Sequence, residues 1–129
     1  MSARKKIDPG WKWDDAYNHS QAIQIGDAIY VSGQVAWDSE GNVVGEGDIK
    51  AQTRQALENV RAVLQAAGSS MDDLVKVTVF VTDIKGLLEA HDLIDEYLPN
   101  PAPALTGVEA TALVFPELLI EIEAIAVKS

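Results

Sequence analysis

Two stretches of the chain repeat apolar residues at helical spacing. In residues 48–68 these positions are Ala56, Leu57, Val60, Val63, Leu64 and Ala67, as on the buried face of a helix. Asp48 is a suitable N-cap and Gly68 a suitable end. In residues 84–98 the apolar side consists of Ile84, Leu87, Leu88, Ile94, Tyr97 and Leu98, with His91 among them. Two helices are therefore predicted, and a proline-rich run ends the second.

Alternating apolar residues predict strands in the rest of the chain. Residues 20–25 and 28–35 flank Gly26 and Asp27, and glycine at the first central position suits a type II′ hairpin turn. In residues 75–83 every second side chain is a valine, so one face is made of Val75, Val77, Val79 and Val81. Two last strands are expected at about 105–113 and 118–127.

The predicted order is β-β-α-β-α-β-β, an α+β fold in which two helices pack on one face of a mixed sheet. We interpret residues 1–129 as a single domain that begins with a lead segment, residues 1–16. Helices on one face leave the other face bare, and a bare apolar face usually marks an interface. Association with like subunits is the simplest way to cover it.

The composition restricts the partners. The chain has 20 acidic and 10 basic residues and a formal charge of -10, so it repels phosphate backbones, and no nucleic acid partner is expected. The basic run at residues 4–6 is either a small patch or, as we expect, a frayed terminus. No cysteine is present, which excludes disulfides and thiolate chemistry. No apolar run reaches the roughly 18 residues of a membrane span, so no membrane partner and a cytoplasmic location are expected.

Two carboxylates on the last strand are candidates for chemistry. Glu121 and Glu123 alternate with apolar residues, which places them on one face, roughly 6.6 to 7 Å apart. A carboxylate among apolar neighbours has a raised pKa and is suited to hold or deprotonate a water molecule. The alternative is that the pair is solvated or salt-bridged, with Lys76 as one partner.

Three further residues draw attention. His19 precedes the first strand, and His91 lies on the apolar side of the second helix, where a packing role is the common one. Gly33 interrupts a strand, which often marks the close approach of a ligand or of another backbone.

Four segments together resemble the RidA (YjgF) family, some members of which carry the label endoribonuclease L-PSP. They are residues 29–34, 51–60, 75–83 and 120–127, in the family's order. The resemblance implies a chorismate-mutase-like fold and a homotrimer with its pocket between subunits. It also implies hydrolysis of enamines and imines, such as 2-aminoacrylate, to ketones and ammonia without a cofactor.

The resemblance assigns pocket roles to particular positions. Glu121 corresponds to the carboxylate that positions the attacking water, and His91 to a pocket asparagine. His19 corresponds to a pocket tyrosine, for which Tyr17 is a spatial substitute. One of these histidines would move a proton, which makes Glu121, His91 and His19 the catalytic candidates.

The sequence departs from the family where substrate is bound. Leu105 replaces the arginine that grips the substrate carboxylate, which argues against 2-aminoacrylate-type activity. Gly107 stands where cysteine is common, which predicts a larger pocket. Backbone N–H groups near Gly33, Thr106 and Gly107 would bind developing negative charge.

Three functions stay open at this point. The leading hypothesis is a cofactor-free hydrolase or deaminase of a small metabolite, and the alternative is a non-catalytic ligand-binding or regulatory trimer. Ribonuclease activity is disfavoured by the acidic charge. A metal held by His19, His91 and Glu121 is conceivable, but the expectation is that no metal is bound.

Overall fold

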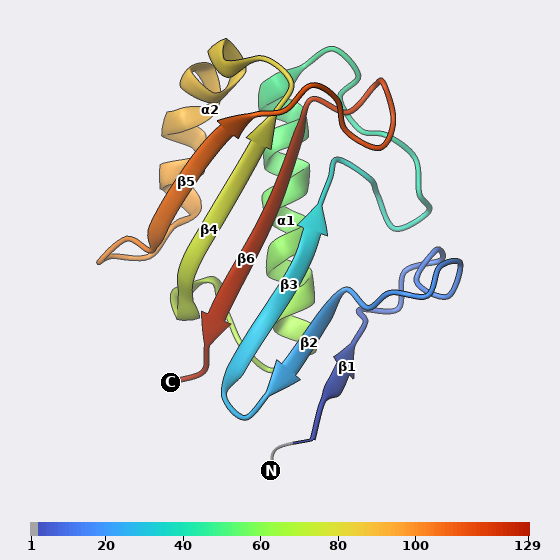
Figure 1. Ribbon diagram of the computed structural model, residues 1–129, viewed down its shortest axis with the longest axis vertical. Coiled ribbons are helices and arrows are strands. Elements are labelled where there is room, and N and C mark those ends of the chain that lie inside the picture. The colour runs from blue at the N-terminus through green and yellow to red at the C-terminus, as the bar shows by residue number, and fades with distance from the viewer. Residues whose placement is uncertain (1–2) are drawn as a thin grey trace.

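The computed structural model describes residues 3–129 and folds them into one sheet and two α-helices (Figure 1). In chain order the elements are β1 (Lys5–Ile7), β2 (Ala22–Ile25), β3 (Ala28–Gln34), α1 (Ile49–Ala66), the 3-10 helix η1 (Met71–Asp73), β4 (Leu74–Val81), α2 (Ile84–Tyr97), β5 (Ala104–Glu109) and β6 (Ile120–Val127). The predicted order is confirmed, with one additional strand at the start.

The strands form a mixed sheet in the order β1-β2-β3-β6-β4-β5. Only β4 and β5 pair in parallel among the described strands, and the other neighbours are antiparallel. Both helices lie on the same face, behind the sheet in the view of Figure 1. The α+β architecture and its bare second face are therefore as predicted. Within residues 3–129, neither helix has the length and apolarity needed to cross a membrane.

The additional strand comes from the lead segment. Lys5 and Lys6 pair with β2, and Ile7 is buried in the core. The expectation of a frayed terminus at residues 4–6 is thus wrong for the two lysines. The pairing satisfies their backbone groups, and the burial of Ile7 fixes the strand in register.

The first hairpin and the first helix form where the sequence predicts them. Gly26 has φ +59°, and no non-glycine residue described has positive φ, which is the pattern of a type II′ turn. Asp48 caps α1 by accepting a hydrogen bond from the N–H of Ala51, 3.1 Å away. The helix packs against β3 and β6, and its apolar face forms the centre of the core with Ile29, Val79, Ile120 and Ile122.

The second helix is rotated relative to the prediction. Its buried side chains are Ala90, Leu93 and Ile94, whereas Leu88 is 73% exposed and the His91 side chain 62% exposed. Two apolar stripes compete in this segment, and packing against α1 and the sheet buries the one that excludes Leu88. The predicted apolar environment of His91 is therefore wrong.

A bulge at the start of β4 changes which side chain enters the core. The register against β6 shifts between Leu74 and Lys76, so Leu74 is 5% exposed and Val75 46% exposed. Val75 was predicted to share the buried face of the later valines. The extra residue of the bulge turns it outward.

Truncating Leu74 is expected to cost far more stability than altering Val75. Leu74→Ala empties a core position and should lower the free energy of unfolding by about 2–5 kcal/mol, while Val75→Thr should change it by about 0.5 kcal/mol or less. Chemical denaturation of both variants measures the difference. If both variants lost the same free energy of unfolding, that result would contradict the bulge.

Candidate functional site

A cavity of about 330 Å³ opens on the face of the sheet that no helix covers, beside β3 and β6. Its walls come from four separate parts of the chain: residues 13–21 before β2, β3 with the loop after it, the loop before β6, and β6 itself. The lining side chains and backbone belong to Trp13, Asp14, Tyr17, His19, Ser20, Gln21, Ser32, Gly33, Val35, Trp37, Val114, Phe115 and Glu121. The size suits a small organic ligand.

Glu121 reaches the cavity because Gly33 has no side chain. A Cβ atom built on Gly33 would overlap Oε2 of Glu121 and crowd the rest of its carboxylate. The carboxylate therefore lies across the backbone of β3, near a break in the register between β3 and β6 at Val31 and Gln34. Within the chain, the group that approaches Gly33 is this side chain, and not the ligand or second backbone that the sequence predicted.

The electrostatics of Glu121 are those of an unpaired, half-buried acid. Burial raises its pKa above the ordinary value of 4.5, and repulsion from Glu123 raises it further. Lys76 is not its partner, since its Nζ donates a hydrogen bond to Oγ1 of Thr106 at 2.7 Å. No ion pair among the described residues involves Glu121 or Glu123. The carboxylate is free to hold a water molecule.

Aromatic rings line the same cavity. Trp13 meets Trp37 edge to face with centroids 5.1 Å apart, and Trp37 lies 5.5 Å from Phe115. Tyr17 and His19 stack with centroids 5.5 Å apart and planes 5° apart. The contacts thus join Trp13, Trp37 and Phe115 into one apolar set, with Tyr17 and His19 as a separate stacked pair.

Buried polar side chains on α1 fix the two loops that carry these rings. Nδ2 of Asn59 donates to the backbone oxygens of Val35 at 2.9 Å and Trp37 at 2.8 Å. Nε2 of Gln52 donates to the oxygen of Glu117 at 2.8 Å, and its Oε1 accepts from the N–H of Leu119 at 2.8 Å. Sequence reasoning missed both residues. The signal that could have found them is their spacing: Gln52 and Asn59 are polar residues seven positions apart on the buried face of α1.

A second set of hydrogen bonds fixes the lead segment. Oδ2 of Asp14 accepts from the N–H groups of Gly10 and Trp11, at 3.0 and 2.7 Å. Its Oδ1 accepts from Nε2 of Gln21 at 3.0 Å, and Oε1 of Gln21 accepts from Nε2 of Gln34 at 2.9 Å. Asp14 is buried and engaged in this way, so Glu121 is the carboxylate of the cavity with no partner.

Comparison with known proteins identifies the family. The model of the family described as endoribonuclease L-PSP matches residues 13–128, nearly the whole chain. The chain belongs to this family, that of the RidA and YjgF proteins. A RutC family protein of Pyrococcus abyssi is 42% identical over 110 residues, which make up 85% of this chain and 86% of that protein.

Two other members of the RidA/YjgF family are similar over most of their length. A protein of Dermatophagoides farinae named 2-iminobutanoate/2-iminopropanoate deaminase is 34% identical, covering 84% of each chain. The crystal structure of RidA from the Antarctic bacterium Psychrobacter superposes with a TM-score of 0.85 at 32% identity, covering 96% of this chain and 99% of that chain. The resemblance seen in the sequence is confirmed at the level of family and fold.

One chain of this RidA/YjgF protein brings together half of the predicted site. Tyr17, His19, Gly33 and Glu121 line the cavity. The other four, His91, Leu105, Thr106 and Gly107, do not line it and lie on α2 and β5 at the far edge of the sheet.

Leu105 and Gly107, which both lie on β5, have different surroundings. Leu105 is 45% exposed. Gly107 does not enlarge a pocket as predicted, because a Cβ atom there would overlap Cδ2 of Leu87. The side chain from α2 already fills the space that the missing cysteine would occupy.

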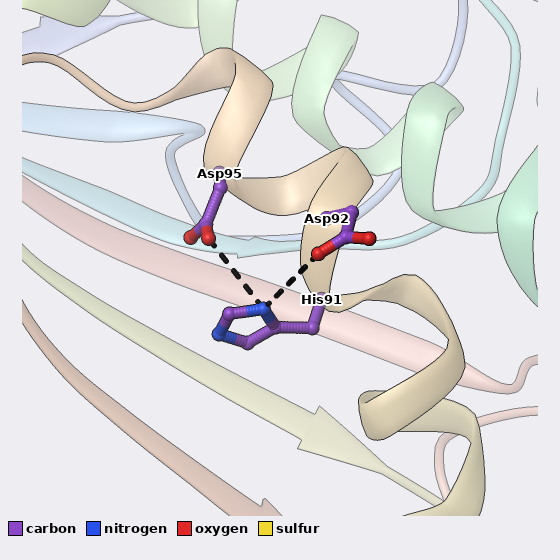
Figure 2. Close-up of side chains that lie close together, drawn as sticks. All are labelled: His91, Asp92 and Asp95. Atoms are coloured by element: carbon purple, nitrogen blue, oxygen red, sulfur yellow. Dashed lines mark ion pairs between the residues drawn. The ribbon is translucent and has the colours of Figure 1, made fainter.

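His91 lies in solvent with two acidic neighbours on its own helix. Its Nδ1 is 3.7 Å from Oδ1 of Asp92 and 3.5 Å from Oδ2 of Asp95, as Figure 2 shows. These three are the one cluster of metal-ligating side chains in residues 3–129, and all are exposed. A single chain does not assemble the metal trio considered from the sequence, His19, His91 and Glu121.

Replacing Glu121 by glutamine should raise stability at neutral pH. Because folding raises the pKa of this carboxyl, the ionised form costs stability above that pKa, and the cost vanishes as pH falls through it. The neutral amide carries no such cost at any pH. Thermal unfolding should show Glu121→Gln melting above the parent at neutral pH, with the gap closing as pH falls towards 4.5.

Glu123→Gln is the matched control, since it removes an exposed carboxylate two residues away. It relieves only the smaller of the two causes that raise the pKa of Glu121, so its effect should be smaller. If the difference in melting temperature between Glu121→Gln and the parent did not change with pH, that result would contradict the raised pKa.

Proposed function

We propose that this protein is a cofactor-free hydrolase that deaminates small enamines or imines, with Glu121 as the base that activates water. The observation that carries the proposal is the unpaired carboxylate of Glu121 across Gly33, at the wall of an aromatic-lined cavity. A half-buried carboxylate of raised pKa is suited to take a proton from water and return it later. The deaminase name of the Dermatophagoides relative supports the same reaction class.

The proposed reaction divides into two steps. Glu121 takes a proton from water while the oxygen bonds to the carbon of the protonated imine, which gives a neutral carbinolamine. The protonated Glu121 then returns the proton to the amine nitrogen. As the C–N bond breaks, the leaving ammonia takes the hydroxyl proton and departs as ammonium, and a carbonyl product remains. His19, stacked on Tyr17 at the cavity wall, and His91 are the candidates to relay protons to solvent.

We propose further that the site is completed by a second copy of the chain in a homotrimer. The uncovered face of the sheet and the exposed edge residues Leu105 and His91 support this. An adjoining subunit would then supply the backbone N–H groups of Thr106 and Gly107 to developing negative charge. Leu105 in the arginine position argues against 2-aminoacrylate as the substrate.

A second candidate is a trimer that binds a small molecule and does not convert it. Leu105 favours this candidate. Without the arginine that binds the substrate carboxylate, a pocket can retain its shape but not the chemistry of the family. A ligand that raises the melting temperature and is recovered unchanged would support binding alone. Ribonuclease activity, which the family description names, is disfavoured by the charge of -10. A cytoplasmic location stays a prediction, and fractionation of the cells checks it.

Glu121→Gln should abolish most of the deaminase activity. Loss of a positioned general base typically lowers turnover by about 10²- to 10⁴-fold. Ammonia release from imines generated in the assay measures it. Glu123→Gln, which keeps Glu121 and removes its exposed neighbour, should leave turnover within about threefold of the parent. Full activity in Glu121→Gln would remove this residue from the mechanism.

Subunit complementation tests the shared site. Light scattering should give about three times the chain mass of 13.9 kDa. If Glu121 and His91 act from different chains, Glu121→Gln and His91→Ala should each be inactive alone. Co-expressed, they should regain about a quarter to a third of the activity, because mixed trimers contain some intact pockets. A monomer, or mixed trimers with no recovery, would contradict the shared pocket.

A further inference from the structure

The cavity carries acidic side chains and aromatic faces but neither lysine nor arginine. Among its lining residues in the described chain, Asp14 and Glu121 are acidic and none is lysine or arginine. Arg4 lines a neighbouring open depression, not this cavity, and Lys76 is bound to Thr106. A carboxylate-bearing ligand would meet Glu121 with no lysine or arginine to balance it, which costs binding energy.

The aromatic walls are suited to the opposite charge. Trp13, Trp37 and Phe115 form a connected set of rings, and Tyr17 lies at the same cavity. A planar cation is attracted to the faces of such rings and to a nearby carboxylate. The apolar part of a ligand would bury itself against the same surface.

We infer that the substrate class is an iminium ion without a carboxylate, carrying an apolar or aromatic substituent, such as the imine left by oxidation of a primary arylalkylamine. This inference rests on the proposed function and specifies its substrate. The reaction balances as R–CH=NH₂⁺ + H₂O → R–CHO + NH₄⁺. Water supplies the oxygen of the aldehyde, and ammonia leaves with the hydroxyl proton of the carbinolamine.

Leu105 fits the same substrate class. In the proposed trimer it would face the cavity of its neighbour with an apolar side chain. An arginine there would grip a carboxylate by two parallel hydrogen bonds, whereas leucine packs against an apolar substituent. The reaction that supplies the substrate is therefore an amine oxidation and not an amino acid oxidation.

Binding of stable analogues tests the charge preference without catalysis. Benzamidine, benzamide and benzoate share one planar shape and carry positive, zero and negative charge at neutral pH. Calorimetry should show benzamidine binding about tenfold more tightly than benzoate, with benzamide between them. Phe115→Leu keeps an apolar wall and removes a ring face, so it should weaken benzamidine more than benzamide. Equal or tighter binding of benzoate would overturn the inference.

A matched pair of substrates tests the reaction. The imines formed from phenethylamine and phenylalanine by their oxidases differ only in the carboxylate. The protein should accelerate hydrolysis of the first more than of the second, and Leu105→Arg should reverse this preference. Gln65→Arg adds the same charge at an exposed position of α1 away from the cavity, and should leave the preference unchanged.

The outcomes separate the two proposals. A preference of the parent protein for the phenylalanine imine would overturn the substrate class and leave the deaminase function standing. If the protein hydrolysed none of the tested imines, both the substrate class and the deaminase function would be overturned.

Discussion

The carboxylate of Glu121 lies half out of water with no cationic partner, and this constraint determines much of the surrounding structure. Its position depends on the missing side chain of Gly33, because any Cβ atom there would push the carboxylate away. Burial and the nearby Glu123 both disfavour the charged form. Such a group weakens the fold at neutral pH, which is typical of residues kept for chemistry and not for stability.

The helix beneath the sheet positions the walls of the cavity. Asn59 and Gln52 use their amides to hold backbone groups of two loops that are far apart in the sequence. Trp37 and Phe115, which these loops carry, thereby meet as one surface. Since each amide is buried and paired, a change at either position would move a wall of the cavity without touching a ligand.

Local sequence patterns predict the fold where the forces are local. Residues 48–68 carry a cap, one apolar stripe and a terminal glycine, and they form α1 as predicted. The prediction is wrong where tertiary packing decides which side chains are buried. Leu88 is exposed because a competing apolar stripe of the same helix packs into the core, and Val75 is exposed because a bulge turns it outward. In the site, the alternation of the last strand indicates Glu121, but Asn59 could not be found by residue type because it acts on backbone oxygens.

In the proposed trimer, subunit association would complete the site. His91 is exposed on α2 and Leu105 on the edge strand β5, whereas Glu121 lies on β6, two strands away. The proposed chemistry depends on the proton affinity of one carboxyl. The most direct measurement is a carbon NMR titration of the Glu121 side chain in the labelled protein. We expect a midpoint above the ordinary value of 4.5. A midpoint at or below 4.5 would contradict the role given to this residue.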